Sequence, residues 1–378
     1  MRLLYVIDSL APGGAETSLV EMAPGLIAGG IDLHILPLGM RLDLAHSIRN
    51  AGAVIHQRDS RAGRAANFRA VLKVARRTSP DLVHTTLYEA DVAGRAAAKA
   101  LGIPSSTSIV NDSYGSSHYA ESMTAKLHVA RALDACTAQF ANGFHAISEA
   151  IAGTVPHRLG IARSRVTVIP RGRDPHAYRY RDSELRRNTR GALGIPDDAK
   201  VILAIGRLEP QKGLHHLLNA LPAVSRAHPD VLTLVAGKDG RSASSLRSKV
   251  EQDRMRVHFL GHRHDIPALL SAADVFCFPS EREGFGGVLM EAMAVGCPIV
   301  ASSIPTTLEV LNGDEHALTG IATAPGDAEA IARALTRVLG NAQEAAAMAA
   351  AARSSFERRF DIKHINKAMI AFFENAYS

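Results

Sequence analysis

Residues 280–302 read SEREGFGGVLMEAMAVGCPIVAS, a glycine-rich turn followed by a helical stretch and a short apolar run. Another apolar run, DVFCFP (274–279), comes directly before the turn, and PIVAS (298–302) closes the stretch. Apolar runs on both sides of a helix are typical of a βαβ unit, in which two parallel strands share one sheet. The stretch therefore predicts an α/β fold whose functional loops follow the carboxyl ends of the strands.

The same alternation of apolar runs and Ala-rich amphipathic stretches extends along the chain and restarts near residue 200. The expected strands are 2–8, 31–38, 81–86, 105–110, 143–147 and 166–170 in the first half and 200–206, 230–237, 255–261, 274–279 and 298–302 in the second. Because 378 residues suffice for two buried cores, we expect two doubly wound domains. The polar segment 171–190 holds seven basic residues against three acidic ones and is the expected linker.

The composition is that of an ordinary globular protein. Hydrophobic residues make up 47% and charged residues 21%, which excludes a disordered or fibrous chain. The chain has three cysteines, Cys136, Cys277 and Cys297, and none is in a C-x-x-C pair. We therefore expect neither a disulfide scaffold nor a thiolate zinc site. This cysteine content fits a protein of the reducing cytoplasm. The formal charge of +6 stands beside no nucleic-acid-binding motif, so nucleic acid is not an expected partner. The longest uncharged run, 292–308, contains two prolines and cannot span a bilayer.

The first expected strand ends at Asp8 and is followed by Gly13 and Gly14, just before a helical stretch. Glycines at such a turn let backbone N–H groups approach a phosphate or a sugar, and the helix N-terminus adds positive potential. Many turns of this kind use glycine for geometry alone, so the pair by itself is compatible with both interpretations. The spacing is not G-x-G-x-x-G, which argues against a dinucleotide-dependent oxidoreductase.

Charged residues also gather in the loops after two strands of the second half. GRLEPQKG (206–213) places Arg207 and Lys212 on one loop, where they suit a diphosphate and can neutralise a departing nucleotide. The alternative interpretation is that Arg207 and Lys212 are solvated loop charges without a ligand. In EGFGGVLME (283–291), glycines expose N–H groups before a helix, and the two carboxylates can accept hydrogen bonds from sugar or ribose hydroxyls. The neighbours of Glu291 are apolar, so an unpaired carboxylate there would be costly.

Together these motifs resemble the retaining nucleotide-sugar glycosyltransferases of family GT4. The resemblance spans nearly the whole chain and rests on Glu283-x7-Glu291, GRLEPQKG, VHFLG (257–261), DVFCFPS (274–280) and GGAE (13–16). It implies the GT-B fold, an α/β architecture of two Rossmann-like doubly wound domains facing across a cleft. The implied parts are an acceptor-binding domain, 1–172, a donor-binding domain, 173–360, and a final helix, 361–378, that returns to the first domain.

The resemblance also implies a role for each matching residue. Arg207 and Lys212 would bind the donor diphosphate and act in catalysis with Glu283, which contacts the sugar, while Glu291 would bind the ribose. The implied donor-binding residues are Gly14, Gly206, Gly284, Phe285, Gly286, Gly287 and Glu291. The donor would be a UDP- or GDP-linked sugar. No metal or other cofactor is expected, because the chain has no Asp-x-Asp pair and the two cations with helix N-termini can neutralise the diphosphate.

The acceptor side departs from the family pattern. Many relatives carry a histidine where this chain has Asn111-Asp112, and the usual Asn-Gly pair after the sixth expected strand reads Arg171-Gly172. His118, seven residues after Asn111, is either a replacement for that imidazole or an ordinary surface residue. The acceptor-side candidates are therefore Gly13, Asn111 and His118.

The expected function is transfer of a hexose, with retention, to the hydroxyl of a sugar, lipid-linked or small-molecule acceptor in cell-envelope or glycoconjugate synthesis. Three alternatives stay open: a glycoside hydrolase that uses Glu283 and Glu291, a nonhydrolysing nucleotide-sugar epimerase of related fold, and a glycan-binding protein without catalysis. The segment 67–77, NFRAVLKVARR, is basic and amphipathic. It is either a crossover helix packed on the sheet or a contact with an anionic membrane, which would place a cytoplasmic protein at the inner face of that membrane.

Overall fold

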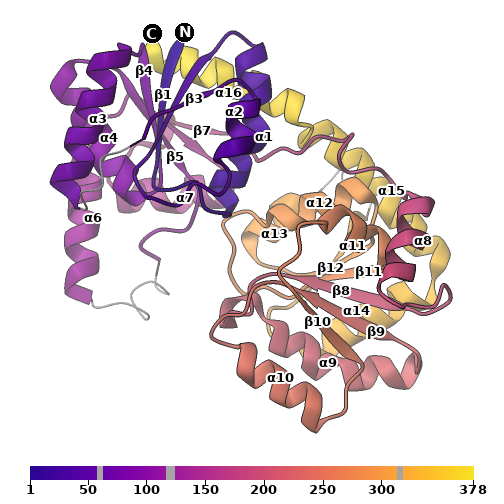
Figure 1. Ribbon diagram of the computed structural model, residues 1–378. Helices are drawn as coiled ribbons and strands as arrows, with labels where there is room; N and C mark the ends of the chain where they lie inside the picture. Colours follow the sequence, from indigo (N-terminus) through magenta and orange to yellow (C-terminus); the bar gives the residue numbers. More distant parts are fainter. Residues whose placement is uncertain (58–62, 116–123, 313–317) are drawn as a thin grey trace. The chain divides into compact units, whose positions relative to one another are not determined.

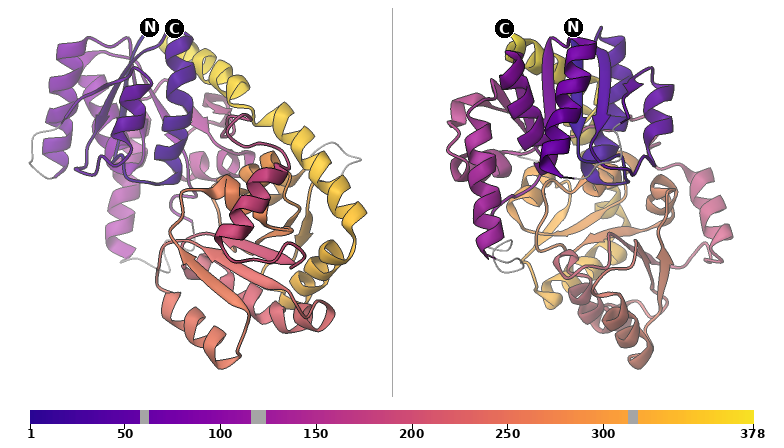
Figure 2. Two further views of the ribbon diagram at one scale, coloured as in Figure 1. Left: turned by 45° about the vertical axis from the view of Figure 1, so that its right-hand side comes forward. Right: turned by 60° about the vertical axis from the view of Figure 1, so that its left-hand side comes forward.

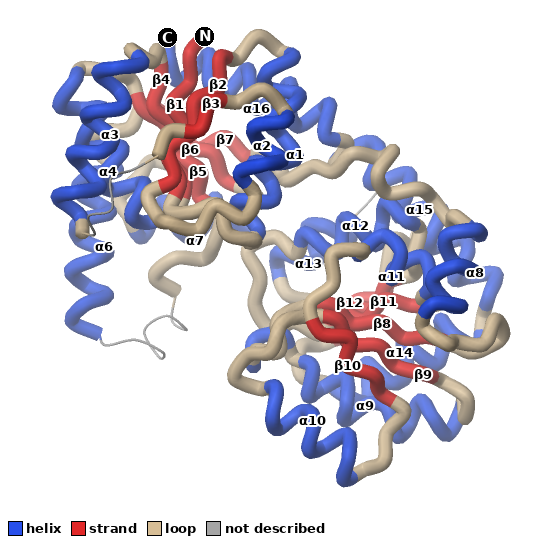
Figure 3. Tube along the Cα trace, in the orientation of Figure 1, coloured by secondary structure: helices blue, strands red, loops and turns tan. Residues whose placement is uncertain are grey.

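The strands form two separate sheets, one in each of the two units into which the chain divides (Figure 1). The computed structural model describes residues 1–57, 63–115, 124–312 and 318–378. Unit 1 consists of Met1–Gly172 together with Ile362–Ser378, and unit 2 consists of Arg173–Asp361. All described strand pairs are parallel, and helices alternate with strands along the chain (Figure 3).

The sheet of unit 1 has the strand order β3-β2-β1-β4-β5-β6-β7. Its strands are β1 (Arg2–Ile7), β2 (Asp32–Pro37), β3 (Val54–Ile55), β4 (Leu82–Thr86), β5 (Ser105–Ile109), β6 (Gly143–Ala146) and β7 (Val166–Val168). Its helices are α1 (Gly14–Ala28), α2 (Ala45–Asn50), α3 (Arg64–Thr78), α4 (Tyr88–Leu101), α6 (Thr124–Ala138), α7 (Glu149–Arg158), the 3-10 helix η1 (Arg163–Arg165) and α16 (Ile362–Tyr377). The strand order reverses between β1 and β4, which is the position at which open α/β sheets bind ligands.

Helices cover both faces of the unit 1 sheet (Figure 2). Alternate side chains of β1 point to opposite faces. Leu3 and Ile7 belong to the same buried cluster as Phe373 of α16, whereas Val6 belongs to a second cluster with Val71 of α3. The last helix of the chain therefore completes the core of unit 1.

The basic amphipathic segment forms α3, and its apolar side lies in the core. Val71, Val74 and Ala75 are buried in the cluster under α3 and α4. The exposed basic residues of the helix include Arg69, Lys73 and Arg76. The apolar side is therefore not available to a membrane, and the helix has the packing of a crossover helix. The basic positions 58 and 61 lie outside the described residues.

The sheet of unit 2 has the strand order β10-β9-β8-β11-β12-β13. Its strands are β8 (Val201–Ile205), β9 (Leu232–Ala236), β10 (Val257–Gly261), β11 (Val275–Phe278), β12 (Ile299–Ser302) and β13 (Ile321–Thr323). Its helices are α8 (Ser183–Ala192), the 3-10 helix η2 (Pro210–Lys212), α9 (Leu214–Ala227), α10 (Ala243–Gln252), α11 (Ile266–Ala272), α12 (Gly287–Val295), α13 (Pro305–Leu311), α14 (Ala328–Gly340) and α15 (Ala342–Arg359). The order reverses between β8 and β11, so this sheet has a switch point of its own.

The Arg-rich segment expected as a linker is mostly part of unit 2. Arg186 and Arg190 of α8 both pair with Asp274, the residue before β11, at 2.8 and 2.9 Å between Nη2 and the carboxylate oxygens. Arg190 is 1% exposed. The chain passes from unit 1 to unit 2 between Gly172 and Arg173, inside the segment expected as a linker. The rest of that segment belongs to unit 2, because these arginines fasten α8 to it.

All eleven strands expected from the sequence are present, within two residues of their predicted bounds. β3 and β13, which have two and three residues, were not predicted. The α/β prediction is confirmed. None of the helices in the described ranges is both long and apolar enough to cross a bilayer.

Candidate functional site

The loops that carry the predicted residues of unit 2 meet at the switch point of its sheet. The loop after β8 contains Arg207 and Lys212, and the loop after β11 contains Glu283. The two loops are in contact, since the Glu281 N–H donates to the Gln211 carbonyl oxygen at 2.9 Å. Groups from both loops are therefore available at the place where such a sheet binds its ligand.

Lys212 and Glu283 form an ion pair between these loops. Lys212 Nζ lies 2.5 Å from Glu283 Oε1, and the two side chains are 18% and 13% exposed. The aliphatic stem of Lys212 runs past Gly206, where a Cβ would lie 3.4 Å from Lys212 Cδ. Arg207 is exposed, and within the described residues its guanidinium makes no hydrogen bond or ion pair. One cation is thus held in place by a carboxylate, and the other is open to an anion.

Gly213 sets how closely the two loops approach. Its φ is +62°, and a Cβ at this position would lie 1.9 Å from the Pro279 carbonyl oxygen. No side chain fits at that distance, and L residues avoid that φ. Glycine at 213 therefore allows the preceding lysine to reach Glu283.

The glycine-rich turn leads into the N-terminus of α12. Gly284 and Phe285 follow Glu283, Gly286 has a φ of +77°, and Gly287 is the first helical residue. Phe285 is 3% exposed and packs edge-on against Phe360, with ring centres 5.9 Å apart. The first N–H groups of a helix have no partner inside the helix and attract anions. The turn therefore presents an anion-binding helix end beside the Lys212–Glu283 pair.

Glu291 is buried in α12 and pairs with an arginine that the sequence pattern does not identify. Arg173 Nε donates to Glu291 Oε1 at 2.9 Å, and Arg173 Nη2 lies 2.8 Å from the same oxygen. The side chains are 4% and 11% exposed. A Cβ at Gly287 would lie 3.2 Å from Arg173 Nη2. The arginine therefore supplies the partner that the buried carboxylate requires and adds positive charge at the start of α12.

In unit 1, Gly13 is the N-cap of α1 and Gly14 is its first residue, at the switch point of the sheet. A Cβ at Gly13 would lie 2.4 Å from Glu16 Oε2, and a Cβ at Gly14 would lie 2.5 Å from Arg171 Nη1. The glycines therefore make room for a carboxylate and a guanidinium. Arg171 gives this end of the sheet a positive charge.

Asn111 lines a cavity of about 60 Å³ at the carboxyl end of β5, together with Tyr88, Asp91 and Tyr114. Its Oδ1 accepts a hydrogen bond from the Ser113 hydroxyl at 2.5 Å. The position is compatible with the expected acceptor-side role. His118 lies outside the described residues.

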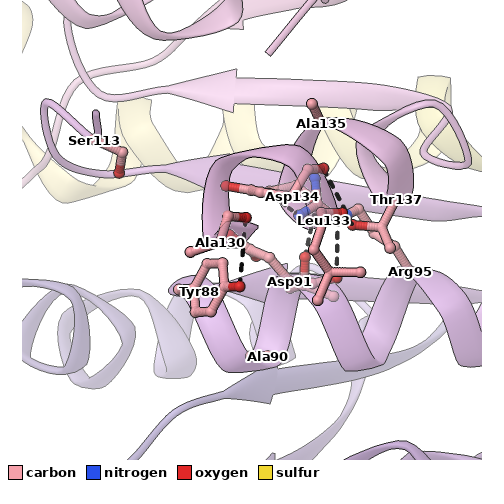
Figure 4. A network of polar contacts seen from close by, with 12 residues as sticks. Tyr88, Ala90, Asp91, Arg95, Ser113, Ala130, Leu133, Asp134, Ala135 and Thr137 are labelled. Carbon is pink, nitrogen blue, oxygen red and sulfur yellow. Dashed lines mark hydrogen bonds and ion pairs between the residues drawn. The ribbon is translucent and has the colours of Figure 1, made fainter. Parts of the chain in front are cut away.

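A buried ion pair lies beside this cavity (Figure 4). Arg95, which is 1% exposed, pairs with Asp134 of α6, and Asp134 also accepts a hydrogen bond from the Tyr114 hydroxyl at 2.8 Å. Arg95 Nε donates to the Asp91 carbonyl oxygen at 2.8 Å. Burial raises the pKa of the Asp91 carboxyl. Burial therefore outweighs the effect of the nearby Arg95 guanidinium, which favours the charged form of this carboxyl.

A chain of buried hydrogen bonds crosses β4, β5 and β6. The two ring nitrogens of His84 lie 2.8 Å from the hydroxyls of Ser106 and Ser108. The Ser108 hydroxyl lies 2.8 Å from His145 Nδ1, and His145 Nε2 lies 2.8 Å from the Ile169 carbonyl oxygen. Because that carbonyl can only accept, His145 Nε2 donates. Burial lowers the pKa of His145 to about 4, so its ring is neutral and Ser108 donates to it.

The arrangement in unit 2 can bind an anion that is joined to a polyhydroxyl body. Its two cations and helix N–H groups suit the anion, and its carboxylates suit the hydroxyls. Gly13, Gly14 and Asn111 belong to unit 1. The residues that sequence reasoning missed are Arg173, His84 and His145. Their signals are the Arg-Gly-Arg triplet after β7 and the run of hydroxyl residues in β5.

Two sequence families match consecutive parts of the chain. The family described as Glycosyltransferase Family 4 matches residues 12–177, and the one described as Glycosyl transferases group 1 matches residues 186–355. The first match lies almost wholly in unit 1, and the second lies in unit 2. Together they take in most of both units.

Curated proteins and solved structures with similar sequences or folds carry related names. An uncharacterized glycosyltransferase of Methanocaldococcus jannaschii is 33% identical over 51% of this chain and 50% of that protein. A GDP-mannose-dependent monoacylated alpha-(1-6)-phosphatidylinositol monomannoside mannosyltransferase of Corynebacterium glutamicum is 32% identical over 50% of this chain and 51% of that protein. The chain thus spans about half the length of these curated relatives. The structure of Anabaena HepE with UDP-glucose has a TM-score of 0.84 and 26% identity, covering 99% of each chain.

Proposed function

Because the chain belongs to glycosyltransferase family 4 and has the GT-B fold, we propose that it transfers a hexose from a nucleoside diphosphate sugar to an acceptor hydroxyl with retention. The observation that carries the proposal is the group at the switch point of unit 2. There Arg207, the Lys212–Glu283 pair and the N-terminus of α12 follow β8 and β11. Cations and free helix N–H groups fit a diphosphate, and carboxylates fit sugar hydroxyls.

In the proposed reaction, Arg207 and Lys212 bind the donor diphosphate. Negative charge grows on this leaving group as its bond to the sugar breaks, so cations held beside it stabilise the transition state more than the ground state. Glu283 positions Lys212 and offers its carboxylate to a sugar hydroxyl. The acceptor attacks from the side on which the diphosphate leaves, and a phosphate oxygen takes the acceptor proton. Attack from that side retains the configuration of the sugar.

We propose that the ribose of the donor and the acceptor are bound by different residues. In this proposal Glu291 binds the ribose diol through its carboxylate, and Arg173 holds that carboxylate in one orientation. The acceptor is a sugar, lipid-linked or small-molecule hydroxyl compound bound to unit 1. Gly13 and Asn111 are its proposed contacts, and the Asp91 carboxyl lines the same cavity as Asn111.

The donor is proposed to be UDP- or GDP-linked, since HepE was crystallised with UDP-glucose and the mannosyltransferase is GDP-mannose-dependent. We expect one nucleoside diphosphate to raise the melting temperature by several degrees, because a ligand at 100 times its Kd adds about 2.7 kcal/mol. Differential scanning fluorimetry with UDP, GDP, UDP-glucose and GDP-mannose measures the shift. Mass spectrometry of products formed with candidate acceptors then identifies the transfer. If none of these compounds shifts the melting curve, the proposed donor site is wrong.

The comparisons support neither a glycoside hydrolase nor an epimerase. A hydrolase would need one of Glu283 and Glu291 as a proton-carrying acid, whereas both carboxylates are paired with cations here. Neither alternative explains why Arg207 and Lys212 lie at the switch point of the unit 2 sheet. The family to which the chain belongs transfers sugars from nucleotides.

We also propose that the diphosphate is neutralised without a metal ion. Arg207, Lys212 and the α12 N-terminus supply the positive charge that a divalent cation would otherwise provide. We therefore expect turnover to be unchanged after treatment with EDTA. Measuring initial rates before and after treatment tests this. Loss of activity that Mg²⁺ or Mn²⁺ restores would contradict it.

Contact with an anionic membrane is part of the proposal for a lipid-linked acceptor. The exposed face of α3 carries Arg69, Lys73 and Arg76, and each basic residue near an anionic bilayer contributes about 1 kcal/mol. The apolar side of α3 is packed in unit 1, so the contact would be purely electrostatic. We expect sedimentation with anionic but not neutral vesicles, abolished by high salt. Charge reversal of the three residues should abolish it too, and absence of binding at low salt would refute the contact.

A further inference from the structure

Two histidines and a glutamate lie next to the Lys212–Glu283 pair without taking part in it. His215 and His216 are in the first turn of α9, and Glu281 is in the loop after β11. His216 Nε2 lies 2.8 Å from Glu281 Oε1, and His215 Nε2 lies 3.7 Å from the same oxygen. The two imidazole ring centres are 3.8 Å apart. Three groups that commonly bind metals therefore converge from two segments.

The geometry of this cluster is close to that of a metal site. One ligand atom from each residue lies within 4.8 Å of the other two, and no second group of this kind occurs among the residues that the structure describes. Zn²⁺ binds imidazole nitrogen and carboxylate oxygen at about 2.0–2.2 Å, which places tetrahedral ligand atoms about 3.4 Å apart. The two separations from Glu281 Oε1 lie on either side of this value, so small side-chain rotations would admit an ion.

The donor atoms select the kind of metal. Two imidazole nitrogens with one carboxylate suit Zn²⁺ and similar transition metals, whereas Mg²⁺ and Ca²⁺ prefer oxygen ligands alone. The side chains are 45%, 18% and 41% exposed for His215, His216 and Glu281, so an ion can reach them from solvent.

We propose that His215, His216 and Glu281 form a binding site for one transition-metal dication, with Zn²⁺ as the expected ion and water as the fourth ligand. The ion would link the start of α9 to the loop after β11, two residues from Glu283. This site is separate from the diphosphate site and does not depend on the proposed transfer reaction. It would stiffen the contact between the two loops rather than neutralise the donor.

Isothermal titration of the full chain, freed of metal with a chelator, tests the site. We expect one Zn²⁺ per chain, with no comparable binding of Mg²⁺, and at least a tenfold weaker Zn²⁺ affinity in His216→Ala and in Glu281→Gln. Co²⁺ should give the d–d absorption of tetrahedral coordination in the parent and not in these variants. His264→Ala is the matched control. His264 lies in a histidine pair with ring centres 4.5 Å apart, which lacks a third ligand residue among those described.

Circular dichroism of each variant shows whether it is folded, and Glu281→Gln keeps the size of the side chain. Zn²⁺ affinity unchanged in His216→Ala and Glu281→Gln would overturn the proposal. Failure of the parent protein to bind Zn²⁺ would overturn it as well, and so would a loss of binding in His264→Ala equal to that in His216→Ala.

Discussion

Lys212→Ala is expected to lower kcat by about 10²–10³, the usual effect of removing one preorganised group that stabilises charge in a transition state. The ammonium lies 2.5 Å from Glu283 and is held there by the close approach of Gly213 to Pro279. Its position is therefore fixed before the donor binds, so little energy is spent in orienting it during the reaction. The same loss is expected for Arg207→Ala, whose exposed guanidinium can be removed with little effect on folding.

Steady-state rates with saturating donor measure this effect, and circular dichroism checks the fold. Arg247→Ala is the matched control, because it removes one cation of unit 2 from an exposed pair with Asp239 and should leave kcat unchanged. Lys212→Arg should recover part of the rate, since it keeps the charge but not the shape. Near-normal turnover in both alanine variants would show that these cations do not act on the leaving diphosphate.

Arg173→Ala is expected to reduce the unfolding free energy of unit 2 by about 3–5 kcal/mol, the effect of leaving one member of a buried ion pair alone. Glu291 would then be an unpartnered carboxylate among Leu289, Met290 and Met293, all of which are 0% exposed. The loss arises from the stranded charge, not from the arginine itself. Arg173→Met combined with Glu291→Leu should therefore restore most of the stability while abolishing the proposed ribose contact.

Two buried thiols of unit 2 provide a local readout of this unfolding. Cys277 and Cys297 are 1% and 3% exposed, so their rate of labelling in increasing urea follows the opening of unit 2 rather than of the whole chain. Arg179→Ala is the control, because the Arg179 side chain is 77% exposed and its pair with Asp182 should contribute no more than about 1 kcal/mol. Equal urea midpoints for Arg173→Ala and the parent would disprove a structural role for the pair.

The sequence predicts the strands and the loops of unit 2 because these depend on local pattern. The apolar runs that became β8 and β11 and the residues just after them are read directly from neighbouring letters. The partner of Glu291 cannot be identified from local pattern. The apolar neighbours of this glutamate predict that its carboxylate needs an ion-pair partner. That partner, Arg173, lies 118 positions away, and only the folded sheet brings the two together. The sequence does not show for the same reason that α8 belongs to unit 2, since its arginines pair with Asp274, far along the chain.

The histidine chain of unit 1 could have been suspected from the sequence. Hydroxyl residues are unusual in a strand buried on both faces, and all five residues of β5 are buried. Such side chains need hydrogen-bond partners inside the core. The identity of those partners, His84 and His145, depends on the pairing of β5 with β4 and β6, which the sequence does not specify residue by residue.

The place of α16 in unit 1 has a consequence for how the protein is made. Unit 2 is one continuous segment, whereas unit 1 needs Ile362–Ser378 to cover the side of its sheet that carries Leu3 and Ile7. A ribosome adds about 5–20 residues per second, so the synthesis of residues 173–361 delays that helix by about 10–40 s. During this interval an apolar surface made early in translation stays uncovered. The nascent chain is thus a natural client for a chaperone, and the segment translated later is the first that can fold completely.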